Sequence, residues 1–293
     1  MGKKKRDVEL VILSDIHLGT YGCHAAELLR YLKSIRPKKL VLNGDIIDIW
    51  QFSKRYWPKS HMQVIKQFTS LLAKSTRIYY IPGNHDEMLR KFAGFKLGTF
   101  TIDNRVLLNL NGNKVWIFHG DVFDVTMQHS KWIAKLGSVG YDILILINRM
   151  ANWFLLKLGR GKISLSKRVK DSVKTAVKFI NNFEITAADI AITNKYDYVA
   201  CGHIHQPEIR PIVTDKGQTV YLNSGDWVEN LTALEFNNGK WSIYRYSDDK
   251  VAQRMKLSKR FEKKLDNDLI FRDLVNQFLQ LKGEHTLRNS GNR

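Results

Sequence analysis

The sequence has few cysteines and a shortage of acidic residues, and it lacks an apolar segment at its start. Its two cysteines, Cys23 and Cys201, lie far apart in a chain of 293 residues, so no disulfide is needed to explain the fold and we expect a reducing compartment. The basic start, Met1–Arg6, runs straight into an apolar stretch, so we expect neither a signal peptide nor an N-terminal membrane anchor. A hydrophobic content of 44% is ample for a buried core.

The shortage of acidic residues leaves the chain strongly basic. It has 47 lysines and arginines against 28 aspartates and glutamates, a formal net charge of +19. Such an excess predicts an anionic partner, which can be nucleic acid, an acidic membrane surface or a phosphorylated substrate. The basic residues gather in three stretches, at residues 3–6, 157–178 and 254–264. A basic stretch by itself often marks only a solvated surface.

Five short motifs rich in Asp, Asn, His and Gly occur along the chain, and each follows an apolar run. Short apolar and β-branched runs that end at Gly, Pro, Asn or Asp predict buried strands. In layered α/β folds ligands gather beyond the carboxyl ends of strands, so these distant segments are expected to converge. The motifs are Asp15-Ile16-His17, Gly44-Asp45, Gly83-Asn84-His85-Asp86, His119-Gly120-Asp121 and Gly202-His203-Ile204-His205.

The side chains of these motifs suit a divalent metal site. They offer carboxylate, imidazole and amide groups, the mixture that Mn²⁺, Fe²⁺ and Zn²⁺ prefer. Five of the nine histidines lie inside the motifs, and His203 and His205 point to the same side if the chain there is extended. A single histidine after a strand is more often structural, but the set as a whole predicts a two-metal phosphoesterase site. Two neighbouring divalent ions activate water and clamp phosphoryl oxygens.

The order of the motifs resembles the calcineurin-like metallophosphoesterase superfamily over residues 8–246. The resemblance implies two divalent ions, manganese in the first place with iron or zinc as alternatives. It implies that Asp15, His17, Asp45 and His205 hold one ion, and that Asp45, Asn84, His119 and His203 hold the other, with Asp45 bridging. It places His85 beside the leaving oxygen with Asp86 orienting it. The alternative role for His85 is structural, fixing Asn84 or Asp15.

The expected fold class is α/β, by resemblance a four-layer α/β/β/α metallophosphoesterase sandwich with a helical insertion that forms a cap. Helices are expected at residues 25–35 and 61–74 between strands, and an Asn238-Gly239 turn predicts a hairpin near the end of the core. The expected organisation is a core at residues 1–123 and 195–246, an insertion at 124–194, and a charged C-terminal extension at 247–293 with a possible helix at 266–281.

The insertion contains an unusual apolar stretch, Val139–Leu158. Charged residues interrupt it well short of the ~20 apolar residues that a spanning helix requires. Two hypotheses remain open. The stretch can be a buried helix of a bundle, or an interfacial helix or the wall of a groove for acyl chains. The basic residues that follow favour the interfacial hypothesis, because a broad apolar face beside Lys and Arg suits an anionic lipid surface.

Together with Gly44-Asp45-Ile46-Ile47-Asp48-Ile49-Trp50, this cap resembles the UDP-2,3-diacylglucosamine diphosphatases of bacterial lipid A synthesis. The resemblance implies a cytoplasmic enzyme bound peripherally to the inner face of the cell membrane, acting on an acylated nucleotide sugar or another phosphorylated lipid. One departure is His85, where the best-known members carry Arg, which places the chain in a sister group or related branch. Charge and placement suggest substrate contacts from Arg149, Asn152, Lys174 and Lys178.

Two other functions compete with this hypothesis. A phosphodiesterase or nuclease of the same superfamily would use the basic stretches to hold nucleic acid, but the sequence has no evident stacking platform or nucleic-acid module. The apolar cap also suits a polyanion poorly. A metal-binding scaffold without catalysis would have a broken ligand set, whereas every ligand position is intact here. A metal-dependent hydrolase of a lipid-linked nucleotide is therefore the leading prediction.

Overall fold

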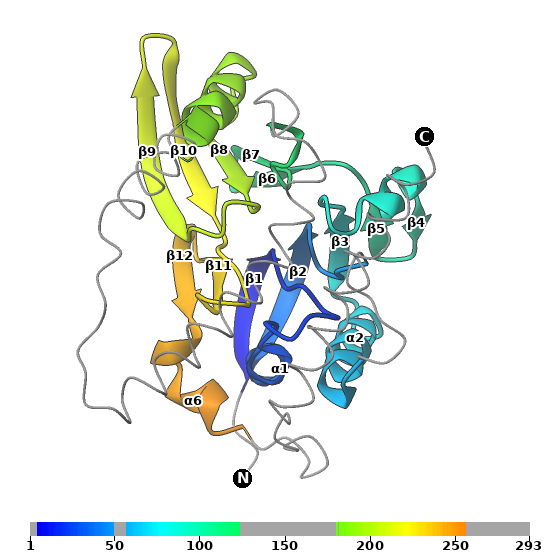
Figure 1. Cartoon of the computed structure of the whole chain (residues 1–293). Coiled ribbons are helices and arrows are strands. Elements are labelled where there is room, and N and C mark those ends of the chain that lie inside the picture. The colour runs from blue at the N-terminus through cyan, green and yellow to red at the C-terminus, as the bar shows by residue number, and fades with distance from the viewer. Residues whose placement is uncertain (1–4, 50–56, 124–179, 181, 256–293) are drawn as a thin grey trace, which may run out of the picture. The chain divides into compact units, whose positions relative to one another are not determined.

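The computed structural model describes residues 5–49, 57–123, 180 and 182–255 (Figure 1). These residues fall in one of two compact units of the chain, the unit made of Met1–Phe123 and Lys174–Phe261. All statements below concern the described part of this unit. It contains two sheets and the helices that cover them.

The first sheet has seven strands in the order β12-β11-β1-β2-β3-β5-β4. Its centre is parallel, because β1 pairs with β2, β2 with β3, and β3 with β5 in the same direction. Helices α1 (Ala25–Ser34) and α2 (Lys59–Leu72) lie between successive parallel strands in the chain. The strands are β1 (Arg6–Leu13), β2 (Ile35–Asn43), β3 (Arg77–Ile81), β4 (Lys96–Leu97), β5 (Phe100–Ile102), β11 (Thr232–Asn237) and β12 (Lys240–Arg245).

The second sheet has five strands in the order β6-β7-β8-β10-β9. Its middle strands, β7, β8 and β10, are parallel, and the edge strands β6 and β9 are antiparallel to their neighbours. A helix over residues 182–193 precedes β8 in the chain. The strands are β6 (Val106–Leu110), β7 (Asn113–Ile117), β8 (Tyr198–Cys201), β9 (Glu208–Thr214) and β10 (Gly217–Asn223).

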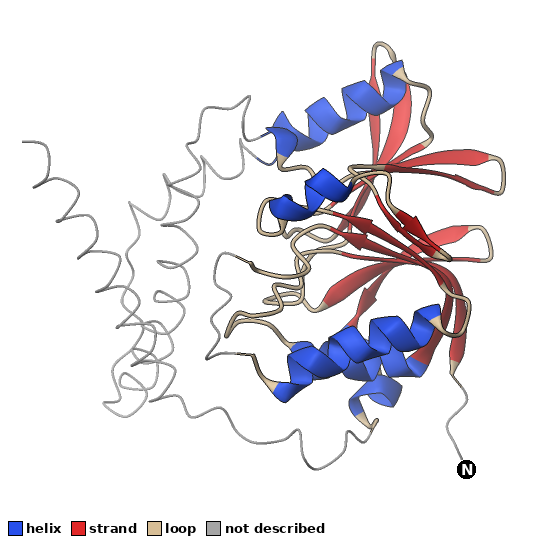
Figure 2. Cartoon of the chain, turned by 90° about the vertical axis from the view of Figure 1, so that its right-hand side faces the viewer, coloured by secondary structure: helices blue, strands red, loops and turns tan. Residues whose placement is uncertain are grey.

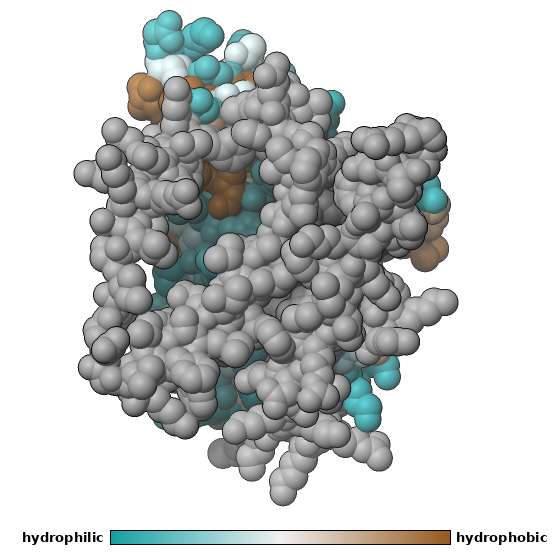
Figure 3. Space-filling model, in the orientation of Figure 1, coloured by the Kyte–Doolittle hydropathy of each residue, from teal (hydrophilic) through white to brown (hydrophobic). Residues whose placement is uncertain are grey.

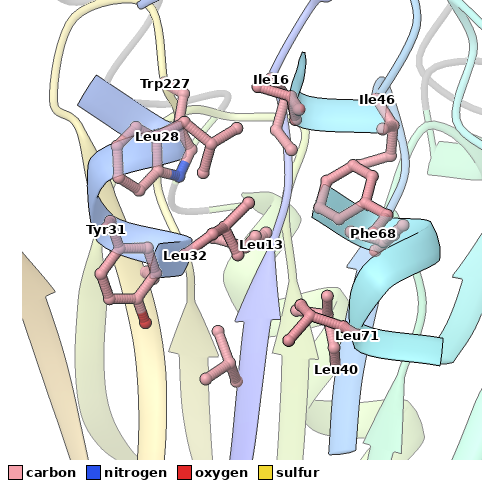
Figure 4. Packing of buried hydrophobic residues seen from close by; sticks show 14 of the residues in the cluster. Leu13, Ile16, Leu28, Tyr31, Leu32, Leu40, Ile46, Phe68, Leu71 and Trp227 are labelled. Atoms are coloured by element: carbon pink, nitrogen blue, oxygen red, sulfur yellow. The ribbon is translucent and has the colours of Figure 1, made fainter. Parts of the chain in front are cut away.

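The two sheets face each other and helices cover both outer faces, which confirms the four-layer sandwich (Figure 2). One buried cluster fills the space between the first sheet and its helices. In Figure 4, Leu28 and Leu32 of α1 and Phe68 of α2 point toward Leu13 and Leu40 of the strands. A second cluster joins side chains of both sheets, including Leu10 from the first and Ile117 from the second. Successive side chains of a strand point to opposite faces of the sheet, so a strand of the first sheet contributes residues to both clusters.

The helix at residues 182–193 covers the outer face of the second sheet. Its buried side chains recur at helical spacing, and Phe183 packs its ring 5.4 Å from that of Phe123. The buried Glu184 forms an ion pair with Arg210 of β9, which ties the helix to the edge of the sheet. These residues lie inside the stretch expected as an insertion, so the described end of that stretch is helical and rests on the sheet.

Most strands and both helices lie where the sequence predicts them. The expected Asn-Gly hairpin joins β11 to β12, with Asn238 at φ +50° and Gly239 at +78°. A second Asn-Gly turn, Asn111-Gly112, joins β6 to β7 with the same positive φ angles and was not predicted. Strands β4 and β5 were not predicted either, and neither was the short 3-10 helix η1 (Glu87–Phe92).

Several sequence predictions lie wholly or partly outside the described residues. They are the apolar stretch Val139–Leu158, most of the insertion at 124–194, and the possible helix at 266–281. The first residues of the expected extension are described. They form η2 (Tyr246–Asp248) and α6 (Lys250–Gln253), and α6 packs against α1 with Ala252 fully buried. In the described part of the chain, no helix has both the length and the apolar character needed to span a membrane.

Candidate metal centre

The predicted ligands follow the carboxyl ends of β1, β2, β3, β7 and β8, and the structure brings them together in two groups. Asp15, His17 and His205 form the first group, and Asp45, His119 and His203 form the second. Within each group the ligand atoms lie within 4.8 Å of one another. Both groups have the imidazole and carboxylate donors that a divalent ion prefers. The convergence expected from the strand ends is therefore present.

The two groups meet at the carboxylate of Asp45. Its Oδ2 atom lies 3.4 Å from Nε2 of His119 in the second group and 4.0 Å from Nε2 of His17 in the first. Its Oδ1 atom accepts a hydrogen bond of 2.8 Å from the backbone N–H of His85. That bond ties the Gly83–Asp86 turn, which carries Asn84 and its buried amide oxygen, to the same carboxylate. Asp45 therefore links the two groups.

Several buried atoms of the centre are oriented for a cation. Nδ1 of His119 donates to the backbone oxygen of Asn43 at 2.8 Å, so its Nε2 atom is the one that lies toward Asp45. Three buried atoms make no hydrogen bond of regular geometry: His119 Nε2, Asp15 Oδ1 and His17 Nε2. Buried polar atoms without such bonds are rare in proteins, because each costs free energy. A divalent ion in each group would coordinate them, so the residues fit a pair of divalent ions.

The buried carboxylates of both groups are kept ionised by their neighbours. Burial would raise the pKa of the Asp15 carboxyl, but the neighbouring His205 imidazole outweighs burial and holds that pKa at about 2. Burial acts on Asp45 in the same direction, yet His119 keeps its pKa well below the usual range. Both carboxylates are therefore ionised at neutral pH, as metal ligation requires.

Five candidate ligands have backbones in the left-handed region, where residues other than glycine are strained. This conformation costs free energy and is found more often at functional sites than elsewhere. Backbone hydrogen bonds hold it in place, among them Asp15 N–H to the oxygen of Gly44 at 3.0 Å and His17 N–H to the oxygen of Asp45 at 2.9 Å. The residues are Asp15 (φ +51°), His17 (+53°), Asp45 (+53°), His203 (+66°) and His205 (+55°).

Two glycines leave room for the ligands. A Cβ atom on Gly83 would overlap the Asp45 carboxylate and lie 2.7 Å from the His119 ring. Gly44 has φ +82°, and a Cβ atom there would overlap the same ring. Glycine is needed at these positions because the backbone passes directly against ligand side chains.

The partner of His85 differs from the prediction. The carboxylate of Asp48, only 1% exposed, lies 2.8 Å from Nδ1 of His85 and 3.5 Å from Nδ1 of His17. Burial disfavours the charged form of His85, but the hydrogen bond with Asp48 and the charge of Asp45 raise its pKa to about 9. Asp48, and not Asp86, is therefore the carboxylate that orients His85. The sequence signal for Asp48 is its place in the Gly44–Trp50 segment, three residues after Asp45.

Asp86 instead connects two motif turns. Its buried carboxylate accepts hydrogen bonds from the backbone N–H of Gly83 at 2.6 Å and of Ile46 at 2.9 Å, and from the Tyr80 hydroxyl at 2.6 Å. The first bond closes the Gly83–Asp86 turn, and the second joins that turn to the loop after β2. Asp86 was predicted to act directly on His85, and that prediction is wrong because both carboxylate oxygens face these other donors.

A loop after β10, residues 223–230, holds the first ligand group. Asn230 donates from Nδ2 to the backbone oxygen of His205 at 2.8 Å and to Oδ2 of the buried Asp226 at 2.5 Å. The backbone N–H of Trp227 donates to the oxygen of Asp15 at 3.1 Å. The loop therefore fixes the backbones of two ligands of one group. The sequence alone revealed neither Asp226 nor Asn230.

The remaining predicted site residues are not described. Arg149, Asn152, Lys174 and Lys178 all lie within residues 124–179, outside the described part of the chain, so their contacts with substrate stay predictions.

Known proteins resemble this chain in sequence. The model of the calcineurin-like phosphoesterase family matches residues 8–207, a span that includes all five motifs. The chain is 29% identical over 239 residues to the UDP-2,3-diacylglucosamine hydrolase of Blochmanniella pennsylvanica, covering 78% of this chain and 92% of that one. It is 22% identical over 243 residues to the enzyme of the same name from Aliivibrio fischeri, covering 80% and 98%. A solved phosphoesterase from E. coli matches with a TM-score of 0.40 at 13% identity, covering 82% and 93%.

Proposed function

Because this chain belongs to the calcineurin-like phosphoesterase family and is a metal-dependent hydrolase, we propose that it cleaves UDP-2,3-diacylglucosamine to UMP and 2,3-diacylglucosamine 1-phosphate in lipid A biosynthesis. The names of the relatives support this substrate. The observation that carries the chemistry is the pair of ligand groups that meet at Asp45. A shared carboxylate between two sets of donors suits two ions and the hydrolysis of a phosphoryl bond.

In this proposal Asp15, His17, Asp45 and His205 hold one divalent ion, and Asp45, Asn84, His119 and His203 hold the other. Manganese is the proposed metal, with iron or zinc as alternatives, because His, Asp and Asn suit all three. When bound, such a pair lowers the pKa of water and neutralises phosphoryl charge. The protein contributes rigid ligand backbones, fixed by the hydrogen bonds of Asp15, His17 and His205.

His85 is proposed to act on the leaving side of the phosphoryl group. Asp48 lies against Nδ1 of its ring, which leaves Nε2 for the substrate. From there the ring can donate a hydrogen bond to a phosphoryl oxygen or a proton to the oxygen that departs as the P–O–P bridge breaks. Asp48 acts by orienting His85. Asp86 contacts neither His85 nor the substrate in this proposal, and it joins the two turns that carry Asp45 and Asn84.

The same His85 supports a second candidate function. Arginine grips a phosphate with two parallel hydrogen bonds, and histidine cannot do so. With His85 in the position where the best-known diphosphatases carry Arg, the site can serve a phosphodiester of another nucleotide or a phospholipid with unchanged metal chemistry. A nuclease is the weakest form of this alternative, because the apolar stretch Val139–Leu158 suits a polyanion poorly.

The rest of the assignment extends the proposal beyond the described residues. Residues 124–194 are proposed as an insertion whose part before the helix at residues 182–193 forms a cap over the substrate, with contacts from Arg149, Asn152, Lys174 and Lys178, and residues 247–293 as an extension. The enzyme is proposed to work in the cytoplasm at the inner face of the membrane. A substrate with two acyl chains and a net charge of +19 on the enzyme support this location.

The test is hydrolysis of UDP-2,3-diacylglucosamine by the purified full chain with Mn²⁺, followed by the release of UMP. Asp45→Ala is the control, because it removes the ligand shared by both groups. Release of UMP that disappears in the control supports the proposal. If the protein cleaves bis(p-nitrophenyl) phosphate with Mn²⁺ but releases no UMP, the substrate assignment is wrong and the phosphodiesterase alternative takes its place.

A further inference from the structure

An apolar and basic surface lies directly after the last residue of the Gly83–Asp86 motif. Ten large hydrophobic side chains are exposed in the described part of the chain, and four of them lie within residues 88–97. No other stretch of similar length gathers as many among the described residues. They are Met88 (51% exposed), Phe92 (46%), Phe95 (47%) and Leu97 (68%).

The backbone beneath these side chains is held firmly. Gly94 N–H donates to the oxygen of Ile102, and Ile102 N–H donates to the oxygen of Phe95, both at 2.9 Å. Leu97 pairs with Phe100 in the antiparallel ladder of β4 and β5. The apolar side chains therefore project from a fixed frame. Clustered apolar side chains that remain exposed on an ordered frame mark an interaction surface.

The frame is also joined to the metal centre. Leu89 N–H donates to the oxygen of Asp86 at 3.0 Å, so η1 starts on the motif itself. Nη2 of Arg90 lies 2.7 and 2.8 Å from the two carboxylate oxygens of Asp121, which follows His119 in its motif. Residues 88–97 are therefore joined to two of the five ligand motifs, to Gly83–Asp86 along the chain and to His119–Asp121 by the ion pair of Arg90.

The net positive charge of this surface favours an anionic partner. Lys91 and Lys96 are exposed, the Arg90 charge is paired with Asp121, and Glu87 is the one acidic residue in the stretch 87–98. Lys91 Nζ lies 5.2 Å from the centre of the Phe92 ring, so a positive charge and an apolar group lie side by side on this surface. In Figure 3, hydrophobic and hydrophilic atoms adjoin at the right-hand edge, where Figure 1 shows β4.

We propose that Met88, Phe92, Phe95 and Leu97, with Lys91 and Lys96, form a docking surface for an anionic lipid bilayer. Apolar side chains enter the acyl boundary while the lysines meet lipid phosphates, the combination by which proteins bind membrane interfaces. Single-stranded nucleic acid would use the two phenylalanines for stacking. It would leave Leu97, the most exposed of the four, without a contact. The choice of a lipid partner rests on the proposed function.

The experiment is co-sedimentation of the full chain with vesicles of phosphatidylcholine containing phosphatidylglycerol. The variant carries Phe92→Ser, Phe95→Ser and Leu97→Ser. A control matched in exposure carries Leu107→Ser, Ile185→Ser and Val213→Ser, three apolar side chains that are exposed elsewhere to a similar degree. We expect the first variant to partition at least about tenfold more weakly and the control to match the wild type. Lys91→Glu should weaken binding by about fivefold or more, and only to vesicles with anionic lipid.

Hydrolysis of bis(p-nitrophenyl) phosphate in solution reports on folding and the metal centre, and it should be equal in all of these proteins. Equal vesicle binding by both triple variants would overturn the proposal. So would a wild type that ignores vesicles but binds single-stranded DNA, or self-associates, through these residues. A wild type that binds vesicles through this surface but releases no UMP from UDP-2,3-diacylglucosamine would refute the proposed substrate and leave the docking surface in place.

Discussion

Asn230 holds the backbone of His205 by a hydrogen bond of 2.8 Å from its side-chain Nδ2 to the His205 oxygen. His205 has a φ of +55°, a strained conformation that it keeps only because neighbouring groups enforce it. The first prediction follows from this bond. In Asn230→Ala, His205 can relax, and the first of the two metal sites should bind Mn²⁺ about fivefold more weakly, the equivalent of one hydrogen bond. Isothermal titration of the metal-free protein measures both sites.

A matched control is available in Asn194. Its Nδ2 atom donates to the backbone oxygen of Ile190 at the same distance of 2.8 Å, at the end of the helix at residues 182–193. Asn194→Ala should leave both Mn²⁺ affinities unchanged. If the two variants lose metal affinity equally, or if Asn230→Ala weakens both sites alike, the bond to His205 does not position a single ligand group.

The second prediction concerns Asp48 and His85, whose side chains meet at 2.8 Å. Asp48→Asn removes the negative charge that orients the His85 ring, so kcat should fall by about a hundredfold, within the range of a lost acid-base catalyst. Metal content, measured by elemental analysis, should stay at the wild-type value because Asp48 belongs to neither proposed ligand set. His85→Ala should lower kcat to a similar level, and the double variant should be no worse than either single variant. Additive losses would show that the two residues act independently.

The third prediction is a pH dependence of stability caused by His61. Its Nδ1 atom accepts a hydrogen bond of 2.9 Å from the backbone N–H of Gly19, and burial lowers its pKa to about 4. An unfolded histidine has a pKa near 6.5, so between pH 6.5 and pH 4 the unfolded chain takes up a proton that the folded chain refuses. Stability due to this group is therefore complete above pH 6.5 and is lost as the pH falls. Between pH 8 and pH 5 the loss should be about 2 kcal/mol.

His61→Asn keeps an acceptor near Gly19 and has no ionisable group. Urea unfolding of the metal-free proteins at pH 8 and pH 5 gives the comparison, because all other titrating groups are shared. The variant should lose about 2 kcal/mol less stability than the wild type over this interval. Equal losses would mean that His61 takes up its proton at the same pH in the folded and unfolded chains.

The sequence was sufficient to predict that the candidate ligands converge, because its signals are local. Each ligand stands just after an apolar run, and parallel strands bring their carboxyl ends to one edge, so the convergence of Asp15, Asp45 and His119 follows from the order of residues alone. The same kind of local signal exists at Asn111-Gly112, whose Asn-Gly turn between apolar runs could have revealed the β6–β7 hairpin.

The residues that the sequence did not reveal act across the chain. Asp48 reaches His85 only because two loops from neighbouring strands pack together, and Asp86 reaches Ile46 for the same reason. Asn230 binds a backbone atom of His205, and a backbone acceptor leaves no mark in the sequence. Such contacts depend on how loops pack, which motif spacing does not encode.

We expect two ions to bind in the two adjoining groups and to share Asp45 as a ligand. Crystals of the full chain grown with Mn²⁺, measured at the manganese absorption edge, test this expectation directly. We expect two anomalous peaks, with Asp45 in contact with both. One should lie among Asp15, His17 and His205, and the other among Asp45, His119 and His203. A single peak, or a peak among His17, Asp48 and His85, which also lie close enough to bind an ion, would contradict it.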